Sequence, residues 1–367
     1  MKDSKLGIGL MSGTSLDGLD IVLVEFSWEK NQLKNTVSFD ILYDETIKYE
    51  GGLAKNLKRA FHMTGEEIAL LNHDLGVYFG NQVNLFIEKT RKNGMNREVD
   101  FIASHGHTVF HKPDLGYTVQ IGNGPEIASI TGIKTVTDFR LQDVVLGGQG
   151  APLVPIGDRY LFGQYGACLN LGGFANISFD DKGVRRAFDI SPANFLLNYY
   201  AKKEGMDYDP DGEYASKGTV NDALVKSLED FEFYSKKAPK TLGQEHIEQF
   251  YIPMIENYGL SFEDKMASIL EHCTDQIAKE VNLLKTNVLV SGGGVYNAFF
   301  MSKLQGKISG SQLVLAEPDL IEFKEALIFA FLGLLKIEGK TNVLASVTGA
   351  SYDHSSGIIR ELSKKIF

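Results

Sequence analysis

The chain has 367 residues, of which 43% are hydrophobic and 23% charged, and its formal net charge is −10. This length predicts about two domains, and the composition is typical of a globular protein. The acidic balance argues against nonspecific binding to nucleic acid or to an anionic membrane, because both depend on basic patches.

The cysteines and the apolar runs predict a cytoplasmic protein. Cys168 and Cys273 are too few for a disulfide framework and suit a reducing compartment. The apolar run after Lys5 is too short for a secretory signal, and the most apolar later stretch, 326–335, is too short for a membrane span. We therefore expect no membrane or nucleic-acid partner, and the oligomeric state stays open, a homodimer included.

The predicted elements alternate between strands and helices along the chain. In order they are a strand pair at 6–26, a helix at 64–93, a strand at 99–104, a second strand pair from 165, helices at 192–204, 219–231 and 265–284, a strand at 287–290, and an apolar helix at 323–337. Strands that alternate with helices predict an α/β fold.

The two strand pairs resemble each other. Residues 6–26 and 167–179 both place a glycine-rich turn with Ser, Thr or Asn side chains between two apolar strands. An ancestral duplication with a ligand between the halves would produce this pattern. Glycine-rich hairpins are also common by chance, so the pattern alone leaves both explanations open.

The turn in the first strand pair has the chemistry of a phosphate site. Backbone N–H groups exposed by glycine, together with hydroxyl donors, suit phosphate oxygens, and a carboxylate beside them suits a bridging divalent cation. A hairpin turn whose side chains bond to one another is the simpler alternative. The candidate residues are Ser12, Gly13, Thr14, Ser15, Leu16, Asp17, Gly18 and Leu19.

Two later glycine turns have related chemistry. Each permits the close approach of a flat or anionic ligand to the backbone. Elsewhere in the chain, Gly333 with 339–341 misses the Walker A spacing by one residue, and Gly7 with Gly9 and Gly13 misses the dinucleotide-binding spacing. Three such turns in one chain favour a bound nucleotide. The candidates are Gly172, Gly173 and Asn176 in the second turn, and Gly292, Gly293, Gly294 and Asn297 in the third.

Three histidines follow the strand at 99–104. The spacing of His105, His107 and His111 can chelate zinc if further ligands converge on it. The alternative is a polar loop whose imidazoles bond to a substrate or to buried backbone.

Two carboxylates are candidates for catalysis or substrate binding. Asp189 comes at the end of a short apolar strand and could take a proton from water or a hydroxyl, but it could equally cap the helix that starts near Pro192. Glu325 lies in an almost wholly apolar helix, where a carboxylate needs a charged partner or a ligand.

Eight motifs give the chain an end-to-end resemblance to the anhydro-N-acetylmuramic acid kinase family of the hexokinase/Hsp70/actin superfamily. They are GLMSGTSLDGLD (9–20), SHGHTVFHKP (104–113), VQIGNGPEIA (119–128), TDFRLQDVVLGGQGAPLVP (137–155), LNLGGFANIS (169–178), FDISPAN (188–194), VSGGGVYN (290–297) and ASVTGA (345–350).

The resemblance implies a two-lobed, duplicated RNase H-like α/β fold with the active site in the interlobe cleft. We expect residues 1–133 plus 340–367 to form the first lobe, with the first phosphate turn. Residues 134–339 would form the second lobe, with the second phosphate turn, the adenosine site at 292–297 and the catalytic aspartate.

The resemblance also implies the reaction. Water attacks the anomeric carbon of 1,6-anhydro-N-acetylmuramic acid while O6 takes the γ-phosphate of ATP, giving N-acetylmuramic acid 6-phosphate and ADP in peptidoglycan recycling. Asp189 matches the family's catalytic base, and Mg²⁺ would neutralise the phosphates. The implied sugar-binding residues are His105, Asp138, Arg140 and Glu325.

The sequence departs from the family pattern at a few of these positions. Ile190, Ser191 and Ala193 stand where the family has Thr, Gly and Gly, and His107 replaces a Gln. The loop 240–245 lacks the family's Arg. These changes keep three alternatives open: a kinase for another sugar, a histidine-ligated hydrolase, and an inactive nucleotide-binding protein.

Overall fold

The structure, a computed structural model, describes residues 2–13, 16–122 and 124–362. Its contacts divide the chain into two compact units, Met1–Leu161 with Phe323–Phe367, and Phe162–Glu322. None of the helices in the described part of the chain is long and apolar enough to cross a membrane.

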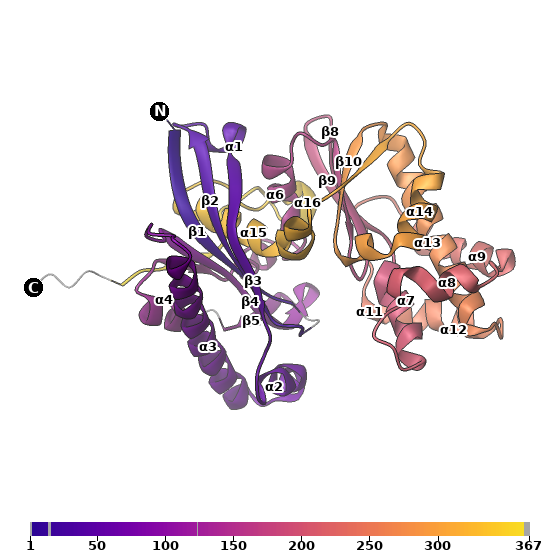
Figure 1. Cartoon of the computed structure of the whole chain (residues 1–367), viewed down its shortest axis with the longest axis horizontal. Helices are drawn as coiled ribbons and strands as arrows, with labels where there is room; N and C mark the ends of the chain where they lie inside the picture. The colour runs from indigo at the N-terminus through magenta and orange to yellow at the C-terminus, as the bar shows by residue number, and fades with distance from the viewer. Residues whose placement is uncertain (1, 14–15, 123, 363–367) are drawn as a thin grey trace, which may run out of the picture. The chain divides into compact units, whose positions relative to one another are not determined.

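The first unit is built on a seven-stranded sheet in the order β12-β6-β4-β1-β2-β3, with β5 on β4 (Figure 1). Strands β1, β2 and β3 form an antiparallel meander, and β4 and β6 continue it in parallel with β1. The strands are β1 (Lys2–Ser12), β2 (Leu19–Glu29), β3 (Ser38–Ile47), β4 (Phe101–Lys112), β5 (Tyr117–Ile121), β6 (Thr135–Thr137) and β12 (Ile358–Arg360).

Helices cover both faces of this sheet. The alternation of side chains along β1 sends Leu6, Ile8 and Leu10 into a core with α3, and leaves Gly7 and Gly9 on the opposite face. The helices are α1 (Leu33–Thr36), α2 (Leu53–Arg59), α3 (Gly65–Lys92), α4 (Pro125–Thr131), α5 (Leu141–Val145), α6 (Val154–Leu161), α15 (Pro318–Ile337) and α16 (Ala345–Thr348), with 3₁₀ turns η1 (Ala60–His62) and η2 (Pro113–Leu115).

The second unit repeats the topology of the first. Its sheet has the order β11-β10-β7-β8-β9, in which β7, β8 and β9 form an antiparallel meander and β10 and β11 run parallel to β7. The strands are β7 (Ala167–Leu171), β8 (Ala175–Asp181), β9 (Val184–Ser191), β10 (Asn287–Ser291) and β11 (Gln312–Leu315). The same strand order and directions in both units confirm the predicted duplicated α/β fold.

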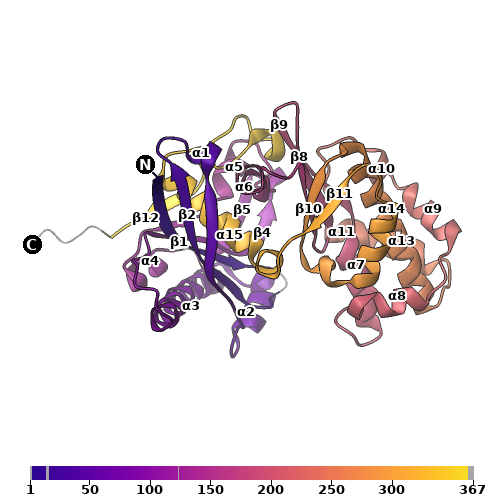
Figure 2. The same cartoon turned by 45° about the horizontal axis from the view of Figure 1, so that its top comes forward.

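The long helix α13 organises the core of the second unit and packs against α7, α8 and α14 (Figure 2). The helices are α7 (Ala193–Lys203), α8 (Glu213–Lys217), α9 (Asp222–Glu229), α10 (Glu232–Ser235), α11 (Gln244–His246), α12 (Ile252–Glu256), α13 (Phe262–Leu284) and α14 (Ala298–Lys307), with η3 (Pro210–Gly212), η4 (Ile247–Tyr251) and η5 (Gly293–Tyr296).

The two units divide the chain differently from the lobes expected from the sequence. Residues 134–161 and 323–339, expected in the second lobe, belong to the first unit. The physical reason is the packing of α15 on the sheet of the first unit: a Cβ on Gly9 would lie 2.0 Å from the carbonyl oxygen of Ala326, and one on Gly333 would lie 2.5 Å from Cβ of Ala103.

Candidate active site

The first predicted phosphate turn joins β1 to β2. Ser12 ends β1 and pairs with Leu19, which opens β2, so the turn is anchored at both ends. Leu19 is fully buried in the core and offers a ligand only its backbone. Thr14 and Ser15, two of the predicted hydroxyl donors, lie outside the described residues.

The rest of this turn is tightly folded. Leu16 has a φ of +63°, and its N–H donates to the carbonyl of Gly13 at 3.3 Å. Gly18 lies against β3, where a Cβ would come within 2.6 Å of the carbonyl oxygen of Ile47. Asp17 is exposed and has no recorded partner among the described residues, so its carboxylate is accessible to a ligand.

The Ser12 hydroxyl is held from two sides. Tyr49 donates its hydroxyl to Oγ of Ser12, and the same Oγ lies 3.0 Å from Nδ1 of His107. Burial lowers the pKa of His107, and its hydrogen bond to Ser12 opposes this shift. The sequence indicated His107 as a candidate zinc ligand and as a departure from the family pattern, and it carried no signal for Tyr49.

The second and third glycine turns lie side by side because β7 and β10 are neighbouring strands. Asn170 pairs with Ser291 at the ends of these strands. Gly292 has a φ of +87°, and a Cβ there would lie 2.5 Å from Oδ1 of Asn170. A Cβ on Gly294 would lie 2.8 Å from Cβ of Leu171. Glycine is therefore required at both positions by conformation or by space.

The second turn is fastened to the start of α7. The carbonyl of Gly172 accepts from the N–H of Asn194 at 3.4 Å, and that of Gly173 accepts from the N–H of Phe195 at 2.8 Å. These bonds use backbone groups at the helix start that would otherwise lack partners.

The remaining residues of these turns differ in their surroundings. A Cβ on Gly293 would meet nothing within 4 Å, so this backbone is open to a ligand. Asn297 caps α14, since its Oδ1 accepts from the N–H of Phe300 at 2.9 Å. Asn176 pairs across β8 and β9 with Asp189, which puts the second turn next to the predicted base.

Asp189 is held at the end of β9 by the loop that follows α10. Its Oδ2 accepts from the N–H of Leu242 at 2.8 Å, and its own N–H donates to the carbonyl of Lys240 at 3.0 Å. Burial raises the pKa of Asp189 to about 6, and the bond from Leu242 opposes this rise. The capping alternative is wrong for this carboxylate, because α7 begins after Pro192 with no side-chain cap.

The residues beside Asp189 that differ from the family pattern are buried in the core. Ile190, Ser191 and Ala193 are all buried, and none of them has a positive φ. Burial raises the pKa of the Cys273 thiol, and Ser191 and the N–H of Ala193 oppose this rise, so both residues lie beside the buried thiol. The extra side-chain atoms are therefore buried without placing these residues in the left-handed backbone region.

Three of the predicted sugar-binding residues converge in the first unit. Nε of Arg140 donates to Nε2 of His105 at 2.8 Å, and the ring of His105 lies 4.6 Å from that of Phe329 on α15. Burial and the positive charge of Arg140 lower the pKa of His105 well below its ordinary value, so the imidazole is neutral. Because Arg140 can only donate, Nε2 of His105 is the acceptor nitrogen.

The charge of Arg140 is balanced by acidic neighbours. Burial lowers the pKa of Arg140 to about 10, while Glu325 and Asp143 oppose this shift. Desolvation raises the pKa of Glu325, although solvent reaches its side chain, and the charges of Arg140 and Lys324 oppose this rise. The charges of Arg140 and Glu325 thus attract each other near a neutral imidazole, and solvent reaches both side chains.

Asp138 interacts with residues of neighbouring helices and strands of the first unit. It adopts a φ of +58° directly after β6. Desolvation raises the pKa of its carboxyl, and the N–H of Leu141 and the charge of Arg360 oppose this rise. Its carboxylate therefore interacts with the start of α5 and with β12.

The histidines of the predicted zinc alternative are engaged elsewhere. His105 accepts from Arg140, Nδ1 of His107 bonds to Ser12, and Nδ1 of His111 lies 3.0 Å from Oγ1 of Thr118. Within residues 2–13, 16–122 and 124–362, no group of three or more His, Cys, Asp or Glu side chains could hold a metal ion. The contacts thus favour the hydrogen-bonding interpretation of this histidine run.

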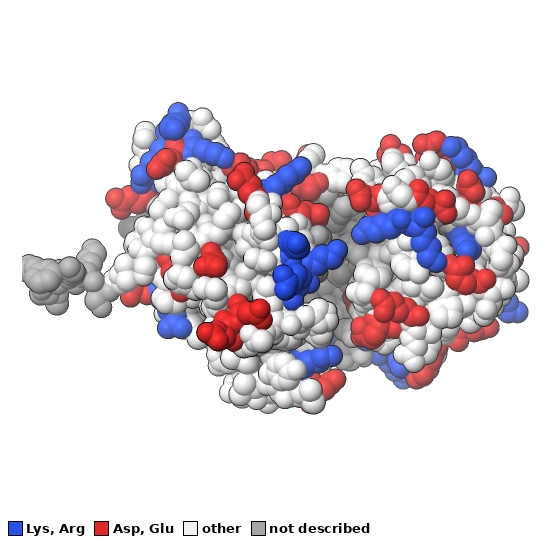
Figure 3. All heavy atoms as spheres, turned by 90° about the horizontal axis from the view of Figure 1, so that it is seen from below, with Lys and Arg blue, Asp and Glu red and all other residues white. Residues whose placement is uncertain are grey.

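Surface charges of both signs are mixed. The face drawn in Figure 3 shows Lys and Arg interspersed with Asp and Glu. Exposed pairs such as Lys89 with Glu45 and Lys203 with Glu256 account for part of this mixture.

Two copies of one strand order, each with a glycine-rich turn after its first strand, place the chain in the class of duplicated RNase H-like α/β proteins. The family model described as anhydro-N-acetylmuramic acid kinase matches residues 5–361. The chain belongs to the anhydro-N-acetylmuramic acid kinase family.

Relatives and solved structures give the degree of similarity. The chain is 35% identical to the anhydro-N-acetylmuramic acid kinase of Shewanella denitrificans, covering 94% of this chain and 95% of that one. It is 35% identical to the enzyme of the same name from Aliivibrio fischeri, covering 96% and 98%. A ROK family glucokinase from Streptomyces griseus has a TM-score of 0.40 and 13% identity over 89% of this chain and 98% of that one, so the family assignment rests on the sequence.

Proposed function

We propose that this chain is an ATP-dependent kinase that opens 1,6-anhydro-N-acetylmuramic acid with water and phosphorylates its O6. The proposal rests on family membership, and the setting of Asp189 is the structural observation that best supports it. A carboxylate with a pKa of about 6, held by one backbone N–H, is ionised at neutral pH and still basic enough to accept a proton.

In the proposed reaction, the Asp189 carboxylate acts as the base. Asp189 takes a proton from water while the water oxygen bonds to the anomeric carbon and the bond from that carbon to O6 breaks. O6 then bonds to the γ-phosphorus of ATP, and ADP leaves with the electrons of the broken P–O bond. The products are N-acetylmuramic acid 6-phosphate and ADP.

Arg140 suits the anionic group of this sugar. Two of its five N–H groups bind His105 and Gly150, and the other three have no recorded partner among the described residues. A guanidinium with free N–H groups fits the carboxylate of the lactyl ether in N-acetylmuramic acid. His105 and Glu325 would then contact the hydroxyl or amide groups of the sugar.

The glycine turns are the proposed ATP site. The turn after Ser12 and the turn at Gly172 and Gly173 would each offer N–H groups to phosphates, and the open backbone at Gly293 would accept a flat base. Asp17 is an exposed oxygen donor of the kind that Mg²⁺ accepts beside phosphates and water, and Mg²⁺ would neutralise phosphate charge there.

The test is ADP release from Mg-ATP with and without 1,6-anhydro-N-acetylmuramic acid, in water enriched in ¹⁸O. We expect sugar-dependent ADP and a product heavier than the sugar by one phosphoryl group (HPO3) plus one water, with the heavy oxygen on the anomeric carbon. Heavy oxygen in released inorganic phosphate would instead indicate ATP hydrolysis. ADP release that prefers another sugar would favour a kinase of different specificity.

A further inference from the structure

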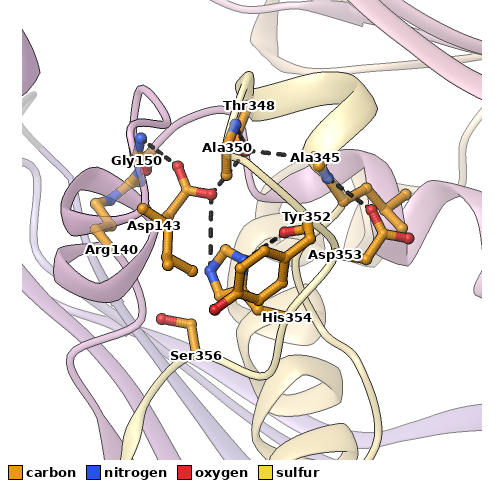
Figure 4. A network of polar contacts seen from close by, with 12 residues as sticks. Arg140, Asp143, Gly150, Ala345, Thr348, Ala350, Tyr352, Asp353, His354 and Ser356 are labelled. Atoms are coloured by element: carbon orange, nitrogen blue, oxygen red, sulfur yellow. Dashed lines mark hydrogen bonds and ion pairs between the residues drawn. The ribbon is translucent and has the colours of Figure 1, made fainter.

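Two motifs that carry the family resemblance, 137–155 and 345–350, meet at one buried carboxylate that the proposed reaction does not use. Asp143 is fully buried. Its Oδ2 accepts from the N–H of Gly150 at 2.7 Å, and its Oδ1 accepts from Oγ1 of Thr348 at 2.7 Å. Figure 4 shows Gly150 and Thr348 approaching the two oxygens from opposite segments of the chain. Gly150 belongs to the 137–155 motif and Thr348 to the 345–350 motif.

The loop from Leu146 to Gly150 is folded around this carboxylate. A Cβ on Gly148 would lie 2.2 Å from Oδ2 of Asp143, and the N–H of Gly148 donates to the Asp143 carbonyl at 2.9 Å. Gly150 has a φ of +67°, and a Cβ there would lie 2.8 Å from Cγ2 of Val144. The glycines of this motif are therefore needed to bring the backbone onto the carboxylate.

The C-terminal segment holds the same loop from the other side. The N–H of Gln149 donates to the carbonyl of Thr348 at 2.8 Å. Ser351 donates to the carbonyl of Leu146 through its N–H at 3.1 Å and its Oγ at 2.6 Å. His354 adds a further polar group, with Nε2 lying 3.7 Å from Oδ1 of Asp143 (Figure 4).

The position of this loop fixes the orientation of the Arg140 side chain. The carbonyl of Gly150 accepts from an Nη of Arg140 at 2.7 Å, while Nε of the same guanidinium donates to His105 at 2.8 Å. Two bonds from different sides fix the plane of the guanidinium. One of them depends on the position of Gly150, which Asp143 holds through the N–H of that residue.

We propose that Asp143 is a positioning residue for sugar recognition, which aims the Arg140 guanidinium at an anionic group of the sugar through Gly150. This inference rests on the proposed function. Asp143 does not touch the sugar, and Thr348, 205 residues away in the sequence, completes the arrangement.

The first test compares substrate constants in Asp143→Asn. The Asn side chain offers one acceptor oxygen and one NH₂ group where two donors converge, so either the N–H of Gly150 or the hydroxyl of Thr348 can no longer donate to it. We expect the KM for 1,6-anhydro-N-acetylmuramic acid to rise on the order of tenfold to a hundredfold. The KM for ATP should stay within about twofold, because the loop binds no part of the proposed ATP site.

A second pair of variants tests the same contact more gently. Thr348→Ser keeps the hydroxyl and should retain the wild-type sugar KM. Thr348→Val removes the donor and should raise the sugar KM, by less than Asp143→Asn does. If Asp143→Asn does not fold, the comparison of Thr348→Ser with Thr348→Val tests the inference by itself.

Calorimetric binding of two sugars then separates positioning from general damage. The comparison ligand is 1,6-anhydro-N-acetylglucosamine, which lacks the lactyl carboxylate. We expect the variants to weaken binding of the carboxylate-bearing sugar and to leave binding of the other within about twofold. Equal weakening of both sugars, equal rises in both KM values with a lower Tm, or an unchanged sugar KM would overturn the inference.

The outcomes distinguish this inference from the function on which it rests. A wild-type chain that binds the sugar but releases no sugar-dependent ADP would contradict the proposed reaction. The binding constants of the variants would then still test the positioning role of Asp143. A wild-type chain that binds neither sugar would overturn both.

Discussion

Asp189 is the residue whose protonation should govern the rate. Its pKa of about 6 means that the ionised form, which accepts the proton, dominates only above that pH. We expect kcat/KM for the sugar to rise with pH up to about 6 and then level off. Asp189→Asn should lower kcat by roughly 10²–10⁴-fold with the KM for ATP unchanged. The control is the pH–rate profile of His107→Gln. Burial lowers the pKa of His107, so the fall in rate below about pH 6 should persist when this imidazole is removed.

The same residue should make stability depend on pH. The folded-state pKa of Asp189 lies above its ordinary value of 3.8, so its contribution favours folding at low pH and is lost as the pH rises through about 6. Asp189→Asn has no carboxyl to ionise, so the variant does not lose this stability as the pH rises. The Tm of the variant relative to wild type should therefore be higher at pH 8 than at pH 4, as measured by calorimetry at both values. A Tm difference that does not change with pH would contradict the raised pKa.

Ser12 depends on its two partners. Tyr49→Phe removes the hydroxyl that donates to Oγ of Ser12, so the side chain loses one of the bonds that hold it in the proposed phosphate turn. We expect the KM for ATP to rise several-fold, on the order of 1 kcal/mol, with the KM for the sugar unchanged. Tyr43→Phe, which removes a surface bond to the carbonyl of Asn93, is the matched control. Equal effects of the two variants on the KM for ATP would argue against a role for Tyr49.

At the scale of elements, the contact between α15 and the first sheet should be sensitive to a single methyl group. A Cβ on Gly9 would lie 2.0 Å from the carbonyl oxygen of Ala326. Gly9→Ala should therefore reduce the free energy of unfolding by roughly 1–3 kcal/mol or more, because backbone must shift. Gly65→Ala is the control, since nothing lies within 4 Å of a Cβ there and alanine is a better helix former. Denaturant unfolding of both variants measures the difference.

At the scale of the whole molecule, the units should differ in their ability to fold alone. The segment 162–322 is continuous and has its own core, so we expect it to unfold cooperatively as an isolated fragment. A fragment 134–339, with the boundaries expected from the sequence, carries the apolar face of α15 without the sheet that covers it. It should aggregate or expose hydrophobic surface. Circular dichroism and dye binding on both fragments test this, and equally good folding of both would contradict the observed division.

Local pattern was enough to predict much of the fold. The helical spacing over 64–93 and 265–284 and the buried strand over 287–290 correspond to α3, α13 and β10. The glycine turns and the position of Asp189 at a strand end were also predicted. These features follow from short-range rules, because side-chain periodicity and backbone freedom depend on neighbouring residues.

The tertiary structure alone decided which distant residues meet. It placed α15 on the sheet of the first unit, set the N–H of Leu242 on Asp189, and brought Thr348 to Asp143. Each of these contacts depends on strand register and on the packing of whole elements, which no local spacing encodes. The sequence by itself determined the elements, the turns and the family. The packing of those elements decided the burial that raises the pKa of Asp189 and the hydrogen bonds that orient Arg140.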